Sequence, residues 1–398
     1  MNIKSATLGS LAAMLMASSA MAVDIKLGVL NDRSGIYADL SGEGSVVAAR
    51  MAIEDFEAAA KGINVEVISA DHQNKPDVAS TIARQWYDEE GVDLIVDVPT
   101  SSAALAVNEI TREKGKIFLN SGAASTDLTG AQCAPGTGHW TYDTYALANG
   151  TGKAMVESGN KNWYFLTADY AFGHSLEENT TKVVEAAGGT VMGSVRHPFP
   201  GTDFSSFLLQ AQASGADVIG LANAGGDTVN SIKQAAEFGI TQAGQALAGL
   251  LIFITDVHAL GLETAQGLVL TEAFYWDLND DTRAWSERFS AEMGGSKPTM
   301  VHAGVYSAVT HYLKGVEAAG SKETEVVMDW MKSNPSQDPV FGAGELRADG
   351  RHIHDMYLFQ VKSPAESTGA WDYYKLLATI PAATAFRPLE DGGCALVE

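Results

Sequence analysis

The chain has 398 residues, a formal net charge of −23 and two cysteines. This length exceeds what one hydrophobic core usually supports, so we expect two lobes. The acidic balance argues against nucleic acid and anionic membrane surfaces as partners, because both repel a polyanion.

The first 22 residues have the pattern of a signal peptide. Lys4 precedes an apolar run, and Ala20, Met21 and Ala22 match the small-x-small cleavage pattern. The run is too short and too rich in Ala and Ser for a bilayer span. We therefore expect an exported chain that begins near Val23, most simply in a bacterial periplasm.

Strand-like and helix-like segments alternate through the first third of the chain. Their order predicts a β-α-β-α-β unit, which is typical of a parallel sheet with helices on both faces. The predicted strands are residues 25–30, 63–71, 92–98 and 116–122, and the predicted helices are 42–60, 75–91 and the segment that starts near 101.

The same alternation restarts at residue 162 and predicts a second, equivalent Rossmann-like unit. Two long helices in succession, 280–294 and 300–320, then break the pattern, and a final strand follows at 353–362. We predict that lobe one comprises 23–142 and 273–343, and that lobe two comprises 143–272 and 344–398. No linker separates the lobes, so we expect them to move as a hinge.

The two cysteines, Cys133 and Cys394, allow two interpretations. An even pair in an exported chain favours a disulfide, and the alternative is two separate buried thiols. Both residues lie in loop-like sequence, which favours the bridge. It would tie the C-terminal tail to a loop far back in the sequence.

Sequence motifs for catalysis or a resident cofactor are absent, so we expect a binding protein and not an enzyme. No nucleophile elbow, phosphate loop, zinc spacing or glycine fingerprint occurs. His352 and His354 share one face of a strand and could bind a metal, but no third ligand is apparent. We favour solvated strand residues there and expect neither a metal nor a cofactor.

Two neighbouring strands of the first unit end in small, hydroxyl-rich turns. Thr100, Ser101 and Ser102 follow the strand at 92–98, and a second turn, 121–126, follows the strand at 116–122. Capping of a helix would explain one hydroxyl. Because ligands of doubly wound sheets bind at the carboxyl ends of strands, the repeated turn favours a site for an anionic group, such as a carboxylate.

These turns, together with the doubled α/β pattern, resemble the type I periplasmic substrate-binding proteins of branched-chain amino acid ABC transporters. The resemblance covers Val23–Glu398. The motifs that carry it are VLNDRSGIYADLSG (29–42), TSS (100–102), SGAAST (121–126), DYAFGHS (169–175) and the segment 201–227. It implies two Rossmann-like lobes joined by three crossing strands, with a ligand between them that is delivered to a membrane permease and its ATPase.

The resemblance also assigns residues to the ligand site. In the first lobe, Thr100 or Ser101 would hold the carboxylate together with Ala123, Ala124 and Ser125. In the second lobe, the resemblance assigns contacts to Tyr170 and Phe172 and to the turn that begins with Asn223 and Ala224. Ordinary loop packing is the alternative for Tyr170 and Phe172.

One departure from the family pattern concerns the glutamate that pairs with an amino-acid ammonium. At this place the chain has Leu250, Leu251, Ile252 and Phe253, although Asp256 and Glu263 lie nearby. A buried ammonium without a counter-charge costs several kcal/mol. We therefore predict a ligand without an α-ammonium.

Aromatic residues are frequent at the expected cleft and hinge, notably Tyr37, Tyr145 and Phe274. With the carboxylate turns, they favour an aromatic or arylalkyl carboxylic acid, and parts of the chain look like the sub-family for aromatic acids. We expect a monomeric receptor of an ABC importer. The alternatives are a ligand sensor on the same fold, or an importer receptor for branched-chain amino acids or amides.

Overall fold

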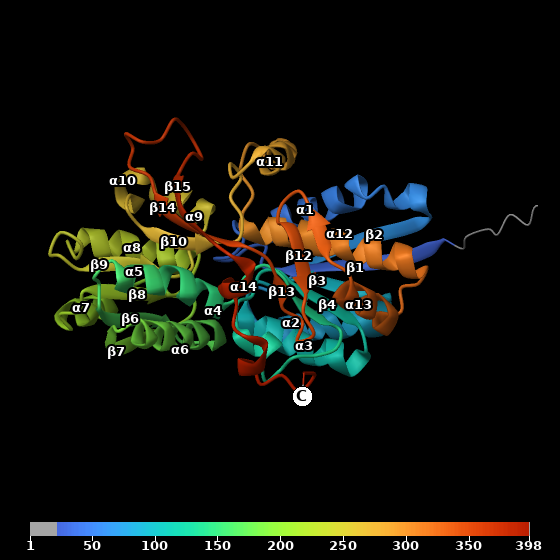
Figure 1. Cartoon of the computed structure of the whole chain (residues 1–398), viewed down its shortest axis with the longest axis horizontal. Helices are drawn as coiled ribbons and strands as arrows, with labels where there is room; N and C mark the ends of the chain where they lie inside the picture. Colours follow the sequence, from blue (N-terminus) through green and yellow to red (C-terminus); the bar gives the residue numbers. More distant parts are fainter. Residues whose placement is uncertain (1–21, 398) are drawn as a thin grey trace, which may run out of the picture.

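The computed structural model describes residues 22–397. The chain forms two α/β units that lie side by side along the long axis of the molecule (Figure 1). The predicted signal peptide, residues 1–22, lies outside the described residues except for Ala22. Within residues 22–397, no helix has the length and apolarity needed to cross a bilayer.

The first unit is built on a five-stranded parallel sheet with the order β2-β1-β3-β4-β5. Its central strands β3 and β4 are buried over their full length, as expected for a sheet that helices cover on both faces. The strands are β1 (Val23–Asn31), β2 (Ile63–Asp71), β3 (Leu94–Asp97), β4 (Ile117–Asn120) and β5 (Thr137–His139). The helices between them are α1 (Gly42–Asp55), η1 (Ala58–Lys61), α2 (Pro76–Gln85), η2 (Trp86–Glu90), α3 (Ser101–Lys114) and η3 (Thr126–Thr129).

The second unit contains a four-stranded parallel sheet with the order β7-β6-β8-β9. Two parallel sheets in two units confirm the predicted pair of Rossmann-like lobes. The strands are β6 (Asn162–Ala168), β7 (Thr190–His197), β8 (Val218–Ala222) and β9 (Ala246–Gly249). The helices are α4 (Thr144–Leu147), η4 (Ala148–Gly152), α5 (Lys153–Glu157), α6 (Ala171–Ala186), α7 (Ser205–Ala213), α8 (Gly226–Glu237), α9 (Ile254–Leu260) and α10 (Leu262–Ala265).

A second sheet of this unit is antiparallel and has the order β10-β14-β15. Its strands are β10 (Val269–Glu272), β14 (Met356–Val361) and β15 (Tyr374–Ile380). The segment between β10 and β14 belongs to the first unit, where α12 packs against α1. It comprises α11 (Asp280–Glu292), α12 (Met300–Ala319), α13 (Thr324–Ser333), β11 (Ser336–Asp338), β12 (Gly342–Leu346) and β13 (His352–Ile353).

The chain thus passes between the units after β5, after β10 and after β13, and the buried Arg351 links two of these passages. Its guanidinium donates to the carbonyl oxygen of Trp140 at 2.7 Å and to that of Tyr142 at 2.9 Å. Asp143 lies 3.7 Å away and balances part of its charge. The side chain therefore fixes the first passage against the start of β13.

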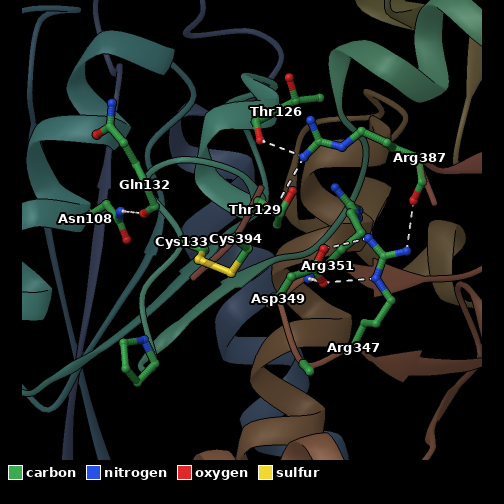
Figure 2. The surroundings of a disulfide bond; sticks show 12 residues. Asn108, Thr126, Thr129, Gln132, Cys133, Arg347, Asp349, Arg351, Arg387 and Cys394 are labelled. Atoms are coloured by element: carbon green, nitrogen blue, oxygen red, sulfur yellow. Dashed lines mark hydrogen bonds and ion pairs between the residues drawn. A yellow bond between two sulfur atoms is a disulfide. The ribbon is translucent and has the colours of Figure 1, made fainter. Parts of the chain in front are cut away.

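After β15 the chain returns to the first unit through α14 (Ala382–Ala385) and η5 (Leu389–Asp391). Cys394 forms a disulfide with Cys133, 261 residues earlier, which confirms the predicted bridge (Figure 2). The lobe boundaries drawn from the sequence stay a prediction. Because β12 and β13 pack with α13 and with the α14 segment, we propose that residues 344–353 and 382–397 belong with lobe one.

Candidate functional site

A narrow cavity lies between the two units. Its walls come from loops that follow the carboxyl ends of strands in both parallel sheets, the place where α/β folds bind ligands. The first unit and the first passage contribute Tyr37, Leu40, Pro99, Gly122, Ala124 and Tyr142. The second unit contributes Tyr170, Phe172, Ala224, Leu251 and Phe253.

We call the turn after β4, residues 122–126, the amide turn. It presents amide groups because its carbonyl groups are already bound. The carbonyl oxygen of Gly122 accepts from the Tyr142 hydroxyl at 2.5 Å. That of Ala123 accepts from the Asn120 amide and contacts His139 Nε2, both at 2.8 Å. That of Ala124 accepts from the amide of Thr144 at 2.9 Å.

The amides of Ala124 and Ser125 both donate to the Ser101 hydroxyl oxygen, at the long distance of 3.3 Å. Ser101 begins α3, so the N-terminal end of that helix faces the same place. A carboxylate can replace the hydroxyl oxygen as the acceptor of these amides and itself accept from Ser101. The arrangement suits the anionic group that the two turns predict.

The other hydroxyls of the two turns have different partners. Thr100 is the N-cap residue of α3, but its hydroxyl donates to the Asn74 side chain. Ser125 Oγ accepts from the amide of Asp127 at 3.3 Å and caps η3. Ser102 is half-buried and does not line the cavity. Capping therefore accounts for Ser125. Ser101, which is buried and does not itself line the cavity, is the hydroxyl that the two turn amides contact.

Gly122 is the wall residue whose identity the packing dictates most strictly. A Cβ atom there would lie 2.6 Å from the Cα of Pro99 and 2.7 Å from Oδ1 of Asp97. Any larger residue would push the two strand-end turns apart. Asp97 is fully buried behind this glycine, and burial raises its pKa to about 6.

Tyrosine hydroxyls from the two units meet at the cavity. The hydroxyl oxygens of Tyr37 and Tyr170 lie 2.6 Å apart, and the Tyr170 ring stacks on Phe199 with centroids 4.0 Å apart. Burial is the main cause that raises the pKa of both tyrosines, so both stay neutral. Beside them, the amide of Gly226 donates to the carbonyl oxygen of Ile36 at 3.3 Å. The two units are therefore in direct contact around the cavity.

The wall formed after β9 is apolar. Leu251 and Phe253 line the cavity, at the place where the resemblance leads us to expect a glutamate. The two nearby acids do not replace it. Asp256 accepts from the amide of Phe253 at 2.9 Å as part of the cap of α9, and Glu263 is exposed. None of the residues that line the cavity is charged.

Four further candidates from the sequence lie outside the cavity wall. Asn223 is buried, and its amide donates to His197 at 3.2 Å and to Ser231 at 3.1 Å. Phe274 packs edge-on against Trp285 in the core, with ring centroids 5.7 Å apart. Tyr145 lies in α4, and Ala123 stands in the amide turn without lining the cavity.

Leu40, Pro99 and Tyr142 line the cavity but were not among the predicted binding residues. Pro99 stands directly before the TSS turn, which was a usable signal. Tyr142 follows the last strand of the first sheet. An aromatic residue on a passage between the lobes was a weaker signal than that of Pro99. Leu40 precedes α1 and lies in the motif 29–42, but nothing in that motif singled it out.

The interpretation of His352 and His354 as solvated residues was wrong, because both are buried. His352 stacks on Trp140 with centroids 4.0 Å apart, and its Nε2 lies 2.7 Å from Ser336 Oγ. His354 stacks on Phe341 at 4.6 Å. Burial lowers the pKa of both rings. Within residues 22–397, no group of three or more metal-ligating side chains is assembled.

The fold and the cavity define a two-lobed ligand-binding protein. The profile of the periplasmic binding protein family matches residues 24–369, and the chain belongs to this family. Leu/Ile/Val-binding protein homolog 6 of Brucella melitensis is 24% identical over 383 residues, which cover 92% of this chain and 95% of that protein. The chain is a substrate-binding protein of the ABC transporter type and not an enzyme.

Solved structures agree with this assignment. A periplasmic binding protein from Burkholderia mallei is 52% identical, with a TM-score of 0.92 and coverage of 94% of this chain and 99% of that one. A branched chain amino acid ABC transporter periplasmic ligand-binding protein from Burkholderia xenovorans LB400 is 41% identical, with a TM-score of 0.84 and coverage of 94% and 100%. A solute-binding protein of an ABC transporter from R. palustris, in complex with benzoate, is 23% identical with a TM-score of 0.83 and coverage of 94% and 100%, and shares the fold.

Proposed function

We propose that this protein is the extracytoplasmic receptor of an ABC importer for a small carboxylic acid with an aromatic or arylalkyl body. The observation that carries this proposal is the polarity of the cavity. Ala124 lines one side, and its amide, the amide of Ser125 and the Ser101 hydroxyl meet just behind that wall. Phe172, Leu251 and Phe253 form apolar walls. The solute would bind between the lobes, which close on it.

The apolar wall argues against an α-amino acid as the solute. An ammonium beside Leu251 and Phe253 would lose its hydration without gaining a counter-charge, which costs several kcal/mol. An aromatic ring in the same place gains roughly 25 cal/mol for each Å² of buried apolar surface. The benzoate-bound R. palustris protein has this fold, so the fold accommodates such ligands.

Isothermal titration of the mature protein tests the solute class. Benzoate, a phenylpropanoid acid and leucine form the minimal panel, with benzamide as the control that keeps the ring and removes the charge. We expect an aryl acid to bind and leucine and benzamide to bind poorly. Micromolar binding of leucine or valine with every aryl acid silent would favour the amino-acid alternative.

The proposal also covers the location, the oligomeric state and the transport partners of the receptor. We place it in the periplasm as a monomer that delivers its solute to a permease and its ATPase. The test is uptake of the bound acid by cells that lack this protein. Loss of uptake supports transport, whereas normal uptake with a lost response to the acid would support the alternative of a sensor.

A further inference from the structure

The C-terminal segment, residues 381–397, lies against the loop that follows the amide turn. We call this segment the C-terminal strap. The disulfide joins Cys394 of the strap to Cys133, with Cα atoms 5.7 Å apart (Figure 2). Upstream in the strap, Phe386 is buried, and its ring lies 4.4 Å from the guanidinium carbon of Arg351. The strap is therefore anchored in the first unit at both of these points.

Arg387 connects the strap with the turn itself. One guanidinium nitrogen donates to the carbonyl oxygens of Thr126 and Thr129, each at 3.4 Å. The backbone of Arg387 is fixed in turn, because its carbonyl oxygen accepts from Arg347 at 2.9 Å and Arg347 is paired with Asp349 (Figure 2). The chain of contacts runs from the end of β12 through the strap to the turn.

The two backbones approach closely at a pair of glycines. A Cβ atom on Gly130 would lie 2.9 Å from the carbonyl oxygen of Gly392, and one on Gly392 would lie 3.3 Å from that of Thr129. Such contacts leave little room for the loop after the turn to move while the strap is in place.

These contacts matter because Thr126 directly follows the amides that face the cavity. Tyr142, Asn120 and the amide of Thr144 bind the first three carbonyl groups of the turn. Arg387 binds the carbonyl group of Thr126. Without Arg387, the carbonyl groups of Thr126 and Thr129 would lose this donor, and the end of the turn would keep only side-chain contacts such as that of Thr126 Oγ1 with Asn179.

We propose that the C-terminal strap is a positioning element of the ligand site, with Arg387 as its positioning residue. It holds residues 126–133 so that the amides of Ala124 and Ser125 stay aligned for the anionic group of the solute. The role of these amides in binding an anionic group rests on the proposed function. The claim that the strap restricts the motion of residues 126–133 does not.

The test compares Arg387→Ala with Arg288→Ala in the otherwise complete mature protein. Arg288 makes a two-pronged ion pair with Asp55 at 2.9 and 2.6 Å, between α11 and α1 and away from the strap, so it controls for the loss of an arginine. Hydrogen exchange of the amides in residues 122–130 measures how strongly the strap restricts the motion of the turn. Titration with benzoate reports the ligand site.

We expect faster exchange in residues 122–130 and benzoate affinity weaker by about fivefold or more for Arg387→Ala, as for coupling between distinct sites. Arg288→Ala should change neither. The double variant Cys133→Ser with Cys394→Ser should shift both readouts in the direction of Arg387→Ala. If Arg387→Ala does not fold, Arg387→Met, which keeps most of the apolar stem and removes every side-chain donor, takes its place with the same expectations.

Unchanged exchange in residues 122–130 overturns the proposal, and so does faster exchange with unchanged benzoate affinity. If the wild-type protein does not bind benzoate, the proposed function has failed for this ligand. The exchange measurement then decides alone whether the strap holds the turn.

Discussion

Gly226→Ala should weaken ligand binding without weakening the fold. Gly226 begins α8 in the second unit, and a Cβ atom there would lie 3.2 Å from Cβ and Cγ2 of Ile36 in the first unit. Carbon atoms prefer about 3.5–4.0 Å, so the closed arrangement is overpacked, at a cost of about 1–3 kcal/mol. If closure accompanies binding, this cost weakens the apparent affinity about fivefold to 150-fold.

The fold itself should tolerate this substitution, because alanine favours a helix over glycine by about 1 kcal/mol. We therefore expect an unchanged or higher Tm, measured by calorimetry, together with weaker titration of an acid that the wild type binds. Gly369→Ala is the control, since no atom would lie within 4 Å of its Cβ. Wild-type affinity in Gly226→Ala, with the same compaction in small-angle scattering on saturation, would refute the closure contact.

Three further predictions concern single groups. Ser101→Ala removes a charge-assisted hydrogen bond of roughly 1.5–3 kcal/mol. Titration should therefore show affinity for a carboxylate about tenfold to a hundredfold weaker. An unchanged affinity would mean that the carboxylate does not bind at Ser101. Burial raises the pKa of Asp227 to about 7, so the folded protein keeps a proton that the unfolded chain releases, and the associated stability is lost as pH rises towards 7. The unfolding free energy of Asp227→Asn relative to wild type should therefore rise from pH ~4 to ~7 and stay level above pH ~7 in urea titrations, and a difference that does not depend on pH would contradict this. Alkylation of periplasmic protein without reductant should leave Cys133 and Cys394 unmodified in mass spectra, and two alkylated thiols would refute the bridge.

The sequence predicted the units and the place of the site because both depend on local patterns. Alternating strands and helices define parallel sheets, and the carboxyl ends of their strands are identifiable from the chain alone. Ser101 and Tyr37 follow from this reasoning, whereas Tyr170 and Phe172 came from the family resemblance. The apolar segment around Leu251 was also visible, and it does line the cavity.

Contacts between distant residues could not be read in the same way. Asn223 directly follows a strand, as a ligand contact would, but His197 and Ser231 already bind its amide. The amide turn depends on Tyr142, which lies 20 residues from its partner Gly122. The return of the strap depends on contacts that reach 261 residues back. Periodicity within a segment carries no information about any of these pairs.

The net charge of −23 leads to a prediction about the rate of association. An anionic solute approaches a polyanion, and the repulsion reaches across about 30 Å at ~0.01 M salt but only about 10 Å at ~0.1 M. We expect the association rate constant of an aryl carboxylate to rise over this range. The dissociation rate constant should change little, because the cavity is enclosed by both units and its lining is uncharged.

Stopped-flow measurements at several salt concentrations test this expectation, with a neutral ligand such as an aryl amide as the control wherever it binds measurably. The rate for the neutral ligand should not depend on salt. A rate for the carboxylate that falls with salt would mean that a local positive potential outweighs the global charge. Arg351 and Arg387 are the cations placed to create it, since one lies beside the first passage and the other binds the end of the amide turn. An association rate constant that rises with salt therefore indicates repulsion by the net charge of the whole protein. One that falls with salt indicates attraction by these two arginines.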